Sequence, residues 1–210
     1  MEYQSQIKQI NETYDERIRK RYGNYISGIY RKSNLTENVE VLHRSKCVGQ
    51  HEDLIIKRGK CEYGTGKIYL REDAFVLPEG YNEHLLIHEY IHRLSCNCKQ
   101  IGLFERKQYG AGFSFLDGDS RRKIFYGAFN EVLTEWIAYQ VTGIKENTRY
   151  QQMLYHIEFL KKRAGNDRFE RLIEAFFKSD LKVRDDILYF VYGIDLPIRI
   201  HQITKEMHSE

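Results

Sequence analysis

Proline and long apolar runs are the scarcest features of this sequence. Only two prolines occur among its 210 residues, and no tract is rich in serine and glycine. Nothing therefore indicates a flexible linker or a disordered arm, and we expect one domain over residues 1–210. No segment approaches the roughly 20 apolar residues that cross a membrane, and the polar N-terminus carries no secretory signal. These absences predict a cytoplasmic protein, although a secreted form whose signal has been removed would look the same.

A strong excess of charge is also lacking. The net charge is only +3, from 33 basic and 30 acidic residues, which is too small to indicate a nucleic-acid partner. Basic clusters at 17–21 and 161–163 lie in segments that look helical, and we interpret them as solvated helix faces. We therefore expect neither a nucleic acid nor a membrane as a partner. Nothing in the residues indicates an oligomeric state.

The cysteines lack the spacing of a structural zinc site. The four cysteines form no pair with a two-residue gap, and Cys96 and Cys98 are too close together for such a site. Reduced thiols are the expectation for a cytoplasmic protein. A bridge between Cys47 and Cys61 is the alternative for an exported one.

Helical and strand-forming segments occupy different parts of the chain. Residues 1–35 are polar, with apolar side chains spaced as on one helix face, so we expect one or two helices there. Residues 36–120 hold a sheet and a central helix. The expected strands are short runs at 38–43, 53–57, 66–71 and 110–115.

Two longer helices are predicted from apolar periodicity. One covers residues 83–95 and has Asn82 as its N-cap, and the other covers 125–142 and ends at Gly143. The remaining part of 121–210 reads as helix throughout. The pattern predicts an α+β protein, in which a small mixed sheet lies over the first long helix and a mainly helical part follows. The expected C-terminal helices are 148–163, 167–178, 181–191 and 197–208.

The first long helix contains the motif His-Glu-x-x-His. His88 and His92 are four residues apart, so both imidazoles lie on one face of a helix and can converge on one ion. Glu89 lies beside His88 and can reach a water molecule bound to that ion. Histidine nitrogens and carboxylate oxygens are the ligands of catalytic zinc, which keeps a fourth position for water. We therefore expect a Zn2+ site; the simpler alternative is two histidines hydrogen-bonded within a core.

The second long helix supplies two carboxylates to one face. Glu131 and Glu135 are one turn apart on an otherwise apolar helix, where carboxylates need a cation or hydrogen-bond donors. On this interpretation Glu131 binds the metal, and Glu135 accepts the free N–H of His88 or His92 and fixes its tautomer. Alternatively, both are exposed charges on an amphipathic helix.

The two segments together resemble a known signature. His-Glu-x-x-His at 88–92, followed by Asn-Glu-x-x-Thr-Glu at 130–135, resembles the gluzincin pattern of thermolysin-like zinc peptidases, His-Glu-x-x-His then Asn-Glu-x-x-Ser-Asp. Thr134 and Glu135 replace the Ser and Asp of that pattern, and the gap between the segments is longer than in thermolysin. The resemblance covers roughly residues 65–140, which implies a compact relative with a zincin-like layout. The residues it implies are His88, His92 and Glu131 as ligands, Glu89 as general base and Glu135 as the acceptor from a ligating histidine.

Two related signatures do not fit. Metzincins take a third histidine ligand shortly after the helix, and residues 93–98 contain none. The anti-repressor peptidases share His-Glu-x-x-His, but their acidic-alanine-asparagine helix downstream is missing here.

The resemblance implies hydrolysis of a peptide or protein substrate. Glu89 would take a proton from the attacking water, and a side-chain donor would stabilise the oxyanion. Tyr126 is the first candidate for that donor because it lies just before Glu131, and Tyr109 and His156 are weaker ones. The substrate would add a strand at a sheet edge, for which segments 67–71 and 112–115 are candidates.

His84 shares the four-residue spacing of the two histidine ligands. Three successive turns of one helix cannot surround a single ion at zinc distances, so we predict that His84 is not a ligand. We place it near solvent or outside the ligand set.

Two other functions remain open at this point. A catalytically degenerate zincin would bind zinc and act as a binding or regulatory module. A nucleic-acid-associated protein would use its basic N-terminal helix and hold the metal as a structural element, but structural zinc is fully ligated by protein and needs no Glu89 beside it.

Overall fold

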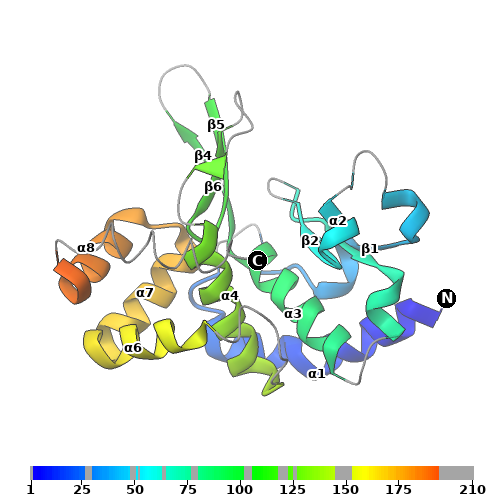
Figure 1. Cartoon of the computed structure of the whole chain (residues 1–210), viewed down its shortest axis with the longest axis horizontal. Helices are drawn as coiled ribbons and strands as arrows, with labels where there is room; N and C mark the ends of the chain where they lie inside the picture. The colour runs from blue at the N-terminus through cyan, green and yellow to red at the C-terminus, as the bar shows by residue number, and fades with distance from the viewer. Residues whose placement is uncertain are drawn as a thin grey trace.

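The N-terminal helix α1, Glu2–Tyr22, lies along one side of the molecule beneath the two central helices (Figure 1). Its buried side chains recur on one face, which confirms the predicted helical segment. The helix is tied to α3, Tyr81–Leu94, by two hydrogen bonds of 2.7 Å between side chains, from Tyr14 to Glu83 and from Tyr90 to Asp15. The buried residues of this face are Ile7, Ile10, Tyr14, Ile18 and Tyr22.

The computed structural model describes most of the chain. Statements about structure refer to residues 2–26, 30–47, 51, 53–62, 65–76, 80–101, 106–117, 123–124, 127–144 and 153–193.

A three-stranded mixed sheet covers one side of α3. The strands β1, Val39–Leu42, β2, Gly59–Cys61, and β3, Ile68–Arg71, lie in the order β1-β3-β2. β1 runs parallel to β3 and β2 antiparallel to it, which confirms the expected small mixed sheet and the α+β class. Short 3-10 turns flank these strands at Leu35–Asn38, Arg44–Cys47 and Glu72–Val76.

The predicted strand at 53–57 is wrong. Residues Asp53–Ile56 form a single helical turn, α2, and the next segment, Gly59–Cys61, supplies the strand instead. The guanidinium of Arg71 explains the difference, because Nη1 donates to the carbonyls of Leu54 and Ile55 at 2.8 and 2.6 Å. It thereby satisfies carbonyl groups that a short helical turn leaves without partners.

Neither of the two segments proposed as sheet edges is a free edge strand, and Gly112 and Phe113 form the turn between two strands of the second sheet. β3 is the central strand of the three-stranded sheet, so its hydrogen-bonding groups face β1 and β2. Ser114 and Phe115 belong to β6, which pairs with a strand on each side. The edge that lies against α3 is β2.

Helix α3 begins two residues earlier than expected. Its N-cap is Gly80, with a left-handed φ of 91°, and not Asn82. The helix ends at Leu94, and the N–H of Ser95 donates to the carbonyl of Ile91. Its residues are buried nearly all round, because β2, β3, α1 and α4 surround it.

A four-stranded antiparallel meander joins the two central helices. It consists of β4, Cys96–Ile101, β5, Arg106–Ala111, β6, Ser114–Asp117, and β7, Lys123–Ile124, in the order β4-β5-β6-β7. The sequence predicted one strand in this region. Figure 1 shows the sheet standing away from the helices.

The described residues from Gly127 onward are mainly helical, as predicted. α4, Gly127–Thr142, packs against α3, and α6, Leu154–Ala164, α7, Asn166–Lys178, and α8, Leu181–Tyr192, form the side opposite the three-stranded sheet (Figure 1). The predicted helix at 197–208 lies outside the described residues. None of the helices in the described part of the chain is long and apolar enough to cross a bilayer.

Candidate metal centre

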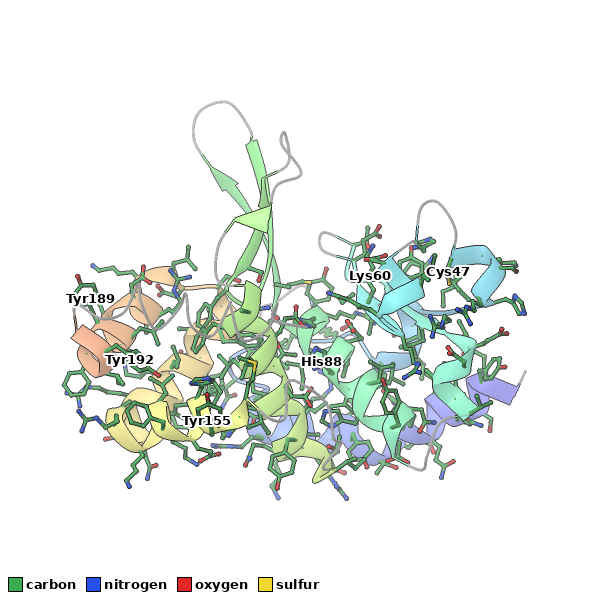
Figure 2. The ribbon with its side chains drawn as sticks, in the orientation of Figure 1. Cys47, Lys60, His88, Tyr155, Tyr189 and Tyr192 are labelled. Atoms are coloured by element: carbon green, nitrogen blue, oxygen red, sulfur yellow. The ribbon has the colours of Figure 1, made fainter. Side chains whose placement is uncertain are left out.

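Two histidines of α3 meet a glutamate of α4 where these helices pack together. Nε2 of His88 lies 3.1 Å from Nε2 of His92, and Oε2 of Glu131 lies 3.3 Å from the first and 3.2 Å from the second. All three side chains are largely buried. Figure 2 shows His88 in the middle of the molecule, between the sheet side and the helical side.

The spacing of these three atoms fits a tetrahedral metal ion. Ligands about 2.05 Å from a zinc ion in tetrahedral geometry lie about 3.3 Å from one another. The observed separations of 3.1 to 3.3 Å agree with that edge length, and no other group of three or more metal-binding side chains occurs among the described residues. A bound cation would satisfy two imidazole nitrogens and a carboxylate oxygen that lie this close together. The residues therefore fit a metal, and the predicted set His88, His92 and Glu131 is a possible metal site.

Neighbouring side chains fix the tautomers of both histidines. Nδ1–H of His88 donates to Oε2 of Glu135 at 2.9 Å, which leaves Nε2 free to bind a metal. Nδ1 of His92 lies 3.5 Å from the hydroxyl of Thr134, which itself donates to the carbonyl of Asn130. The sequence left open which histidine Glu135 contacts, and the answer is His88. A contact from Thr134 to His92 was not anticipated.

His84 also contacts Glu135. Nε2 of His84 lies 2.9 Å from Oε1 of Glu135, and Nδ1 lies 3.2 Å from the hydroxyl of Thr142. The side chain of His84 is 2% exposed, so the prediction that it lies near solvent is wrong. The alternative prediction, that it lies outside the ligand set, agrees with these contacts. Both carboxylate oxygens of Glu135 thus have a histidine partner, which holds the carboxylate in one orientation.

The cluster shifts the pKa of its members in opposite directions. Burial alone would lower the pKa of His88, but hydrogen bonds to Glu131 and Glu135 outweigh it and raise that pKa well above its usual value. Burial alone would raise the pKa of Glu131, but the charge and hydrogen bonds of His92 and His88 lower it well below its usual value. The carboxylate is therefore ionised and available as a ligand. Burial alone would also raise the pKa of Glu135, but its hydrogen bonds and charge interactions with His84 and His88 lower that pKa.

Glu89 lies beside the cluster and close to β2. Burial raises its pKa, and the nearby His88 and His92 oppose that shift. A methyl group on Gly59 would lie 3.1 Å from Cγ and Oε1 of Glu89 and 3.0 Å from Leu85. The missing side chain of Gly59 therefore lets the edge strand approach the carboxylate closely. This role was not predicted, because Gly59 lies between the strands expected from the sequence.

Asn130 anchors the start of α4 to the meander. Its Oδ1 accepts the backbone N–H of Phe113 at 2.7 Å, and the residue is fully buried. This bond holds Glu131 next to the point where the meander returns to the helices. Asn130 belongs to the motif at 130–135, and the structure gives it a positioning role.

The proposed oxyanion donors receive no support from the described residues. Tyr126 lies outside them, and for Tyr109 only the backbone, in β5, is described. His156 lies on α6 against the ring of Tyr155, and Figure 2 shows Tyr155 on the helical side, away from His88.

We expect His84→Ala to lower the affinity for zinc roughly tenfold, because Glu135 loses the partner that orients it towards His88. Competition against a fluorescent zinc chelator measures the change. His84→Gln, which can still donate a hydrogen bond, should restore part of the loss. His43→Ala is the matched control, since His43 is exposed and contacts Glu72 and Ser45. Unchanged affinity in His84→Ala would show that Glu135 needs no second partner.

We expect Gly59→Ala to retain the metal and to lose about 10- to 100-fold in catalytic rate, because the added methyl displaces the Glu89 carboxylate. Metal content and the rate on any cleaved peptide are measured together. Gly127→Ala is the control, since a methyl group there meets nothing within 4 Å. A full rate in Gly59→Ala would mean that β2 moves away without disturbing Glu89.

The fold and the cluster define an α+β protein with a possible His-His-Glu metal site at the contact of two helices. No family model, no curated protein and no solved structure matches the chain. Function must therefore be argued from the site itself.

Proposed function

We propose that the protein is a zinc-dependent peptidase of the gluzincin type, with His88, His92 and Glu131 as ligands and Glu89 as the general base. The convergence of three ligand atoms at tetrahedral spacing carries this proposal. The carboxylate of Glu89 beside them supplies the group that a purely structural metal site does not need. The order of sheet, metal helix and helical half agrees with the zincin layout.

Zinc is the best fit to this donor set. Magnesium and calcium prefer oxygen ligands, whereas two imidazoles and one carboxylate suit zinc and other transition metals. When bound, zinc lowers the pKa of a water molecule and polarises a carbonyl group.

Different residues of the chain would have different roles in the hydrolysis. Glu89 accepts a proton from the attacking water and passes it to the leaving nitrogen, for which its burial-raised pKa is suited. His84 and Glu135 keep His88 in the ligating tautomer. A donor to the oxyanion is still required, and Tyr126 remains the candidate.

The peptide substrate is proposed to pair with β2. This strand is an edge of its sheet, pairs only with β3 among the described strands, and lies against α3 beside Glu89. An extended peptide added to that edge would place its backbone next to the metal ligands. This proposal replaces the segments 67–71 and 112–115.

Elemental analysis of the purified protein tests the metal site. We expect about one zinc per chain, and its loss in Glu131→Ala, because two histidines alone leave the site without its anionic ligand. Glu174→Ala is the matched control, since Glu174 pairs with Lys178 on α7. Absence of zinc after reconstitution would refute the metal site and the peptidase together.

A peptide library tests the reaction. The zinc-loaded protein is incubated with a proteome-derived peptide mixture, and new termini are identified by mass spectrometry. Zinc-dependent cleavage supports the peptidase. Stable zinc binding without any cleavage would instead favour a degenerate zincin that acts as a binding or regulatory module.

A further inference from the structure

The two basic clusters of the sequence, at 17–21 and 161–163, meet at one cavity. They lie far apart in the chain, yet Arg17 and Arg21 of α1 and Lys161 of α6 together line a cavity of about 250 Å³. Residues of α4 and α7 complete its lining. We propose that this cavity binds the phosphate group of a small molecule.

Helical spacing determines which arginines of α1 line the cavity. Arg17 and Arg21 are four residues apart, so they share one face of the helix. Arg19, which lies between them, donates instead to the carbonyls of Arg31 and Ser33. The basic segment is therefore divided: one arginine holds a neighbouring loop, and the other two line the cavity.

The charges around the cavity do not cancel. Glu170 is the only carboxylate among the lining residues, and it pairs with Arg21. Arg17 and Lys161 form no ion pair with a carboxylate of the described chain. Three cations against one anion leave the lining with a net charge of +2. A hollow lined mainly by charge of one sign attracts and concentrates counter-ions, so an anion is the expected ligand.

Aromatic side chains form the floor of the cavity and position the lysine. Tyr22, Trp136 and Val141 line it and are buried. The ammonium of Lys161 lies 5.5 Å from the centre of the Trp136 ring, and a hydrogen bond of 2.6 Å from Nε1 to Glu158 fixes that ring. The lysine is thus held beside the cavity, which reduces the entropy that it loses on binding an anion.

The size of the cavity and the type of its donors favour a phosphate group. The volume is below the roughly 300 Å³ at which pockets for drug-sized ligands begin, so the ligand must be small. Two guanidinium groups and one ammonium group offer several N–H donors, and the oxygens of a phosphate dianion can accept from more than one of them. The same positive charges would repel a metal cation.

The cavity and the candidate metal site lie on different faces of α4. Glu131 and Glu135 contact histidines of α3, whereas Trp136 and Gln140 line the cavity with residues of α1 and α6. Figure 1 shows α4 between α3 and α6. Phosphate binding at the cavity should therefore leave the zinc content unchanged, and its failure would not affect the proposed peptidase.

The fluorescence of Trp136 tests the proposal, because this residue is the only tryptophan of the chain. The full-length protein, as purified, is titrated with inorganic phosphate and separately with phenyl phosphate, against sodium chloride at matched ionic strength. We expect a saturable change with either phosphate and none with chloride, and calorimetry should give the same midpoints. Tighter binding of phenyl phosphate would identify a phosphate ester as the ligand, and equal affinities would identify free phosphate. Absence of saturable binding in both methods overturns the proposal.

Matched variants distinguish the cavity from a general effect of net charge. Arg17→Gln and Lys161→Gln should each weaken phosphate binding roughly tenfold, because each removes a charged donor. Lys20→Gln removes an exposed charge of α1 that does not line the cavity, and it should bind as the wild type does. Glu170→Gln should bind roughly threefold more tightly, since it removes the carboxylate of the lining.

The thermal midpoint without phosphate shows whether each variant is folded. Unchanged affinity in both Arg17→Gln and Lys161→Gln overturns the proposal. Equal losses in Arg17→Gln and Lys20→Gln also overturn it, because net charge alone would then explain the binding.

Discussion

Glu89→Gln should bind zinc as the wild type does and should cleave peptides at least about 10³-fold more slowly. Glutamine has the size of glutamate but cannot accept a proton from water. The three proposed ligands are untouched, so metal content and thermal midpoint should stay the same. The measurement is the rate on the best peptide from the library, with metal content determined on the same sample.

The control for this prediction lies on the same helix. Glu83→Gln changes a carboxylate in the first turn of α3, where it accepts a hydrogen bond from Tyr14 and takes no part in the metal cluster. That variant should keep the wild-type rate. A wild-type rate in Glu89→Gln would show that Glu89 is not the general base. Loss of zinc in Glu89→Gln would show that Glu89 supports the ligands instead.

Gly112→Ala should destabilise the fold by about 3 to 4 kcal/mol. Gly112 has a left-handed φ of 58°, and a methyl group there would lie 2.2 Å from Oδ1 of Asn130 and 2.3 Å from Cε2 of Phe176. Neither side chain can move easily to make room for the methyl group, because Asn130 accepts a hydrogen bond from the backbone of Phe113 and Phe176 is fully buried. Denaturant unfolding measures the loss, and we expect zinc content to fall as well because the start of α4 is displaced.

Gly143→Ala separates backbone strain from crowding. Gly143 also has a left-handed φ, of 70°, but a methyl group there meets nothing within 4 Å. Its substitution should cost only about 1 to 2 kcal/mol. Equal losses in the two variants would show that crowding against Asn130 contributes nothing at Gly112.

The meeting of His88, His92 and Glu131 was predictable because helical periodicity fixes which side chains share a face. Side chains four residues apart share a helix face, so His88 and His92 had to point the same way, and so did Glu131 and Glu135. Carboxylates on an apolar face then required a cation or donors. The structure provides two hydrogen-bond donors for Glu135, the imidazoles of His84 and His88.

Features that depend on distant contacts were not predictable. Segment 53–57 has the composition of a strand, yet hydrogen bonds from Arg71 favour a helical turn there. The meander strands β4 and β5 are polar and lack the alternation that identifies a strand with one buried face.

Among the described residues, the base of the meander is the part that is anchored beside the candidate metal site. Cys96 pairs with Ala111, Ala111 pairs with Ser114, and Phe113 between them binds Asn130. The pairs from Lys99 to Ile101 lie progressively further from this anchor. Changes in hairpin length at the far end should therefore leave the ligand positions intact. The meander is a place where a reporter peptide or a targeting sequence could be grafted onto the protein without rebuilding the candidate metal site.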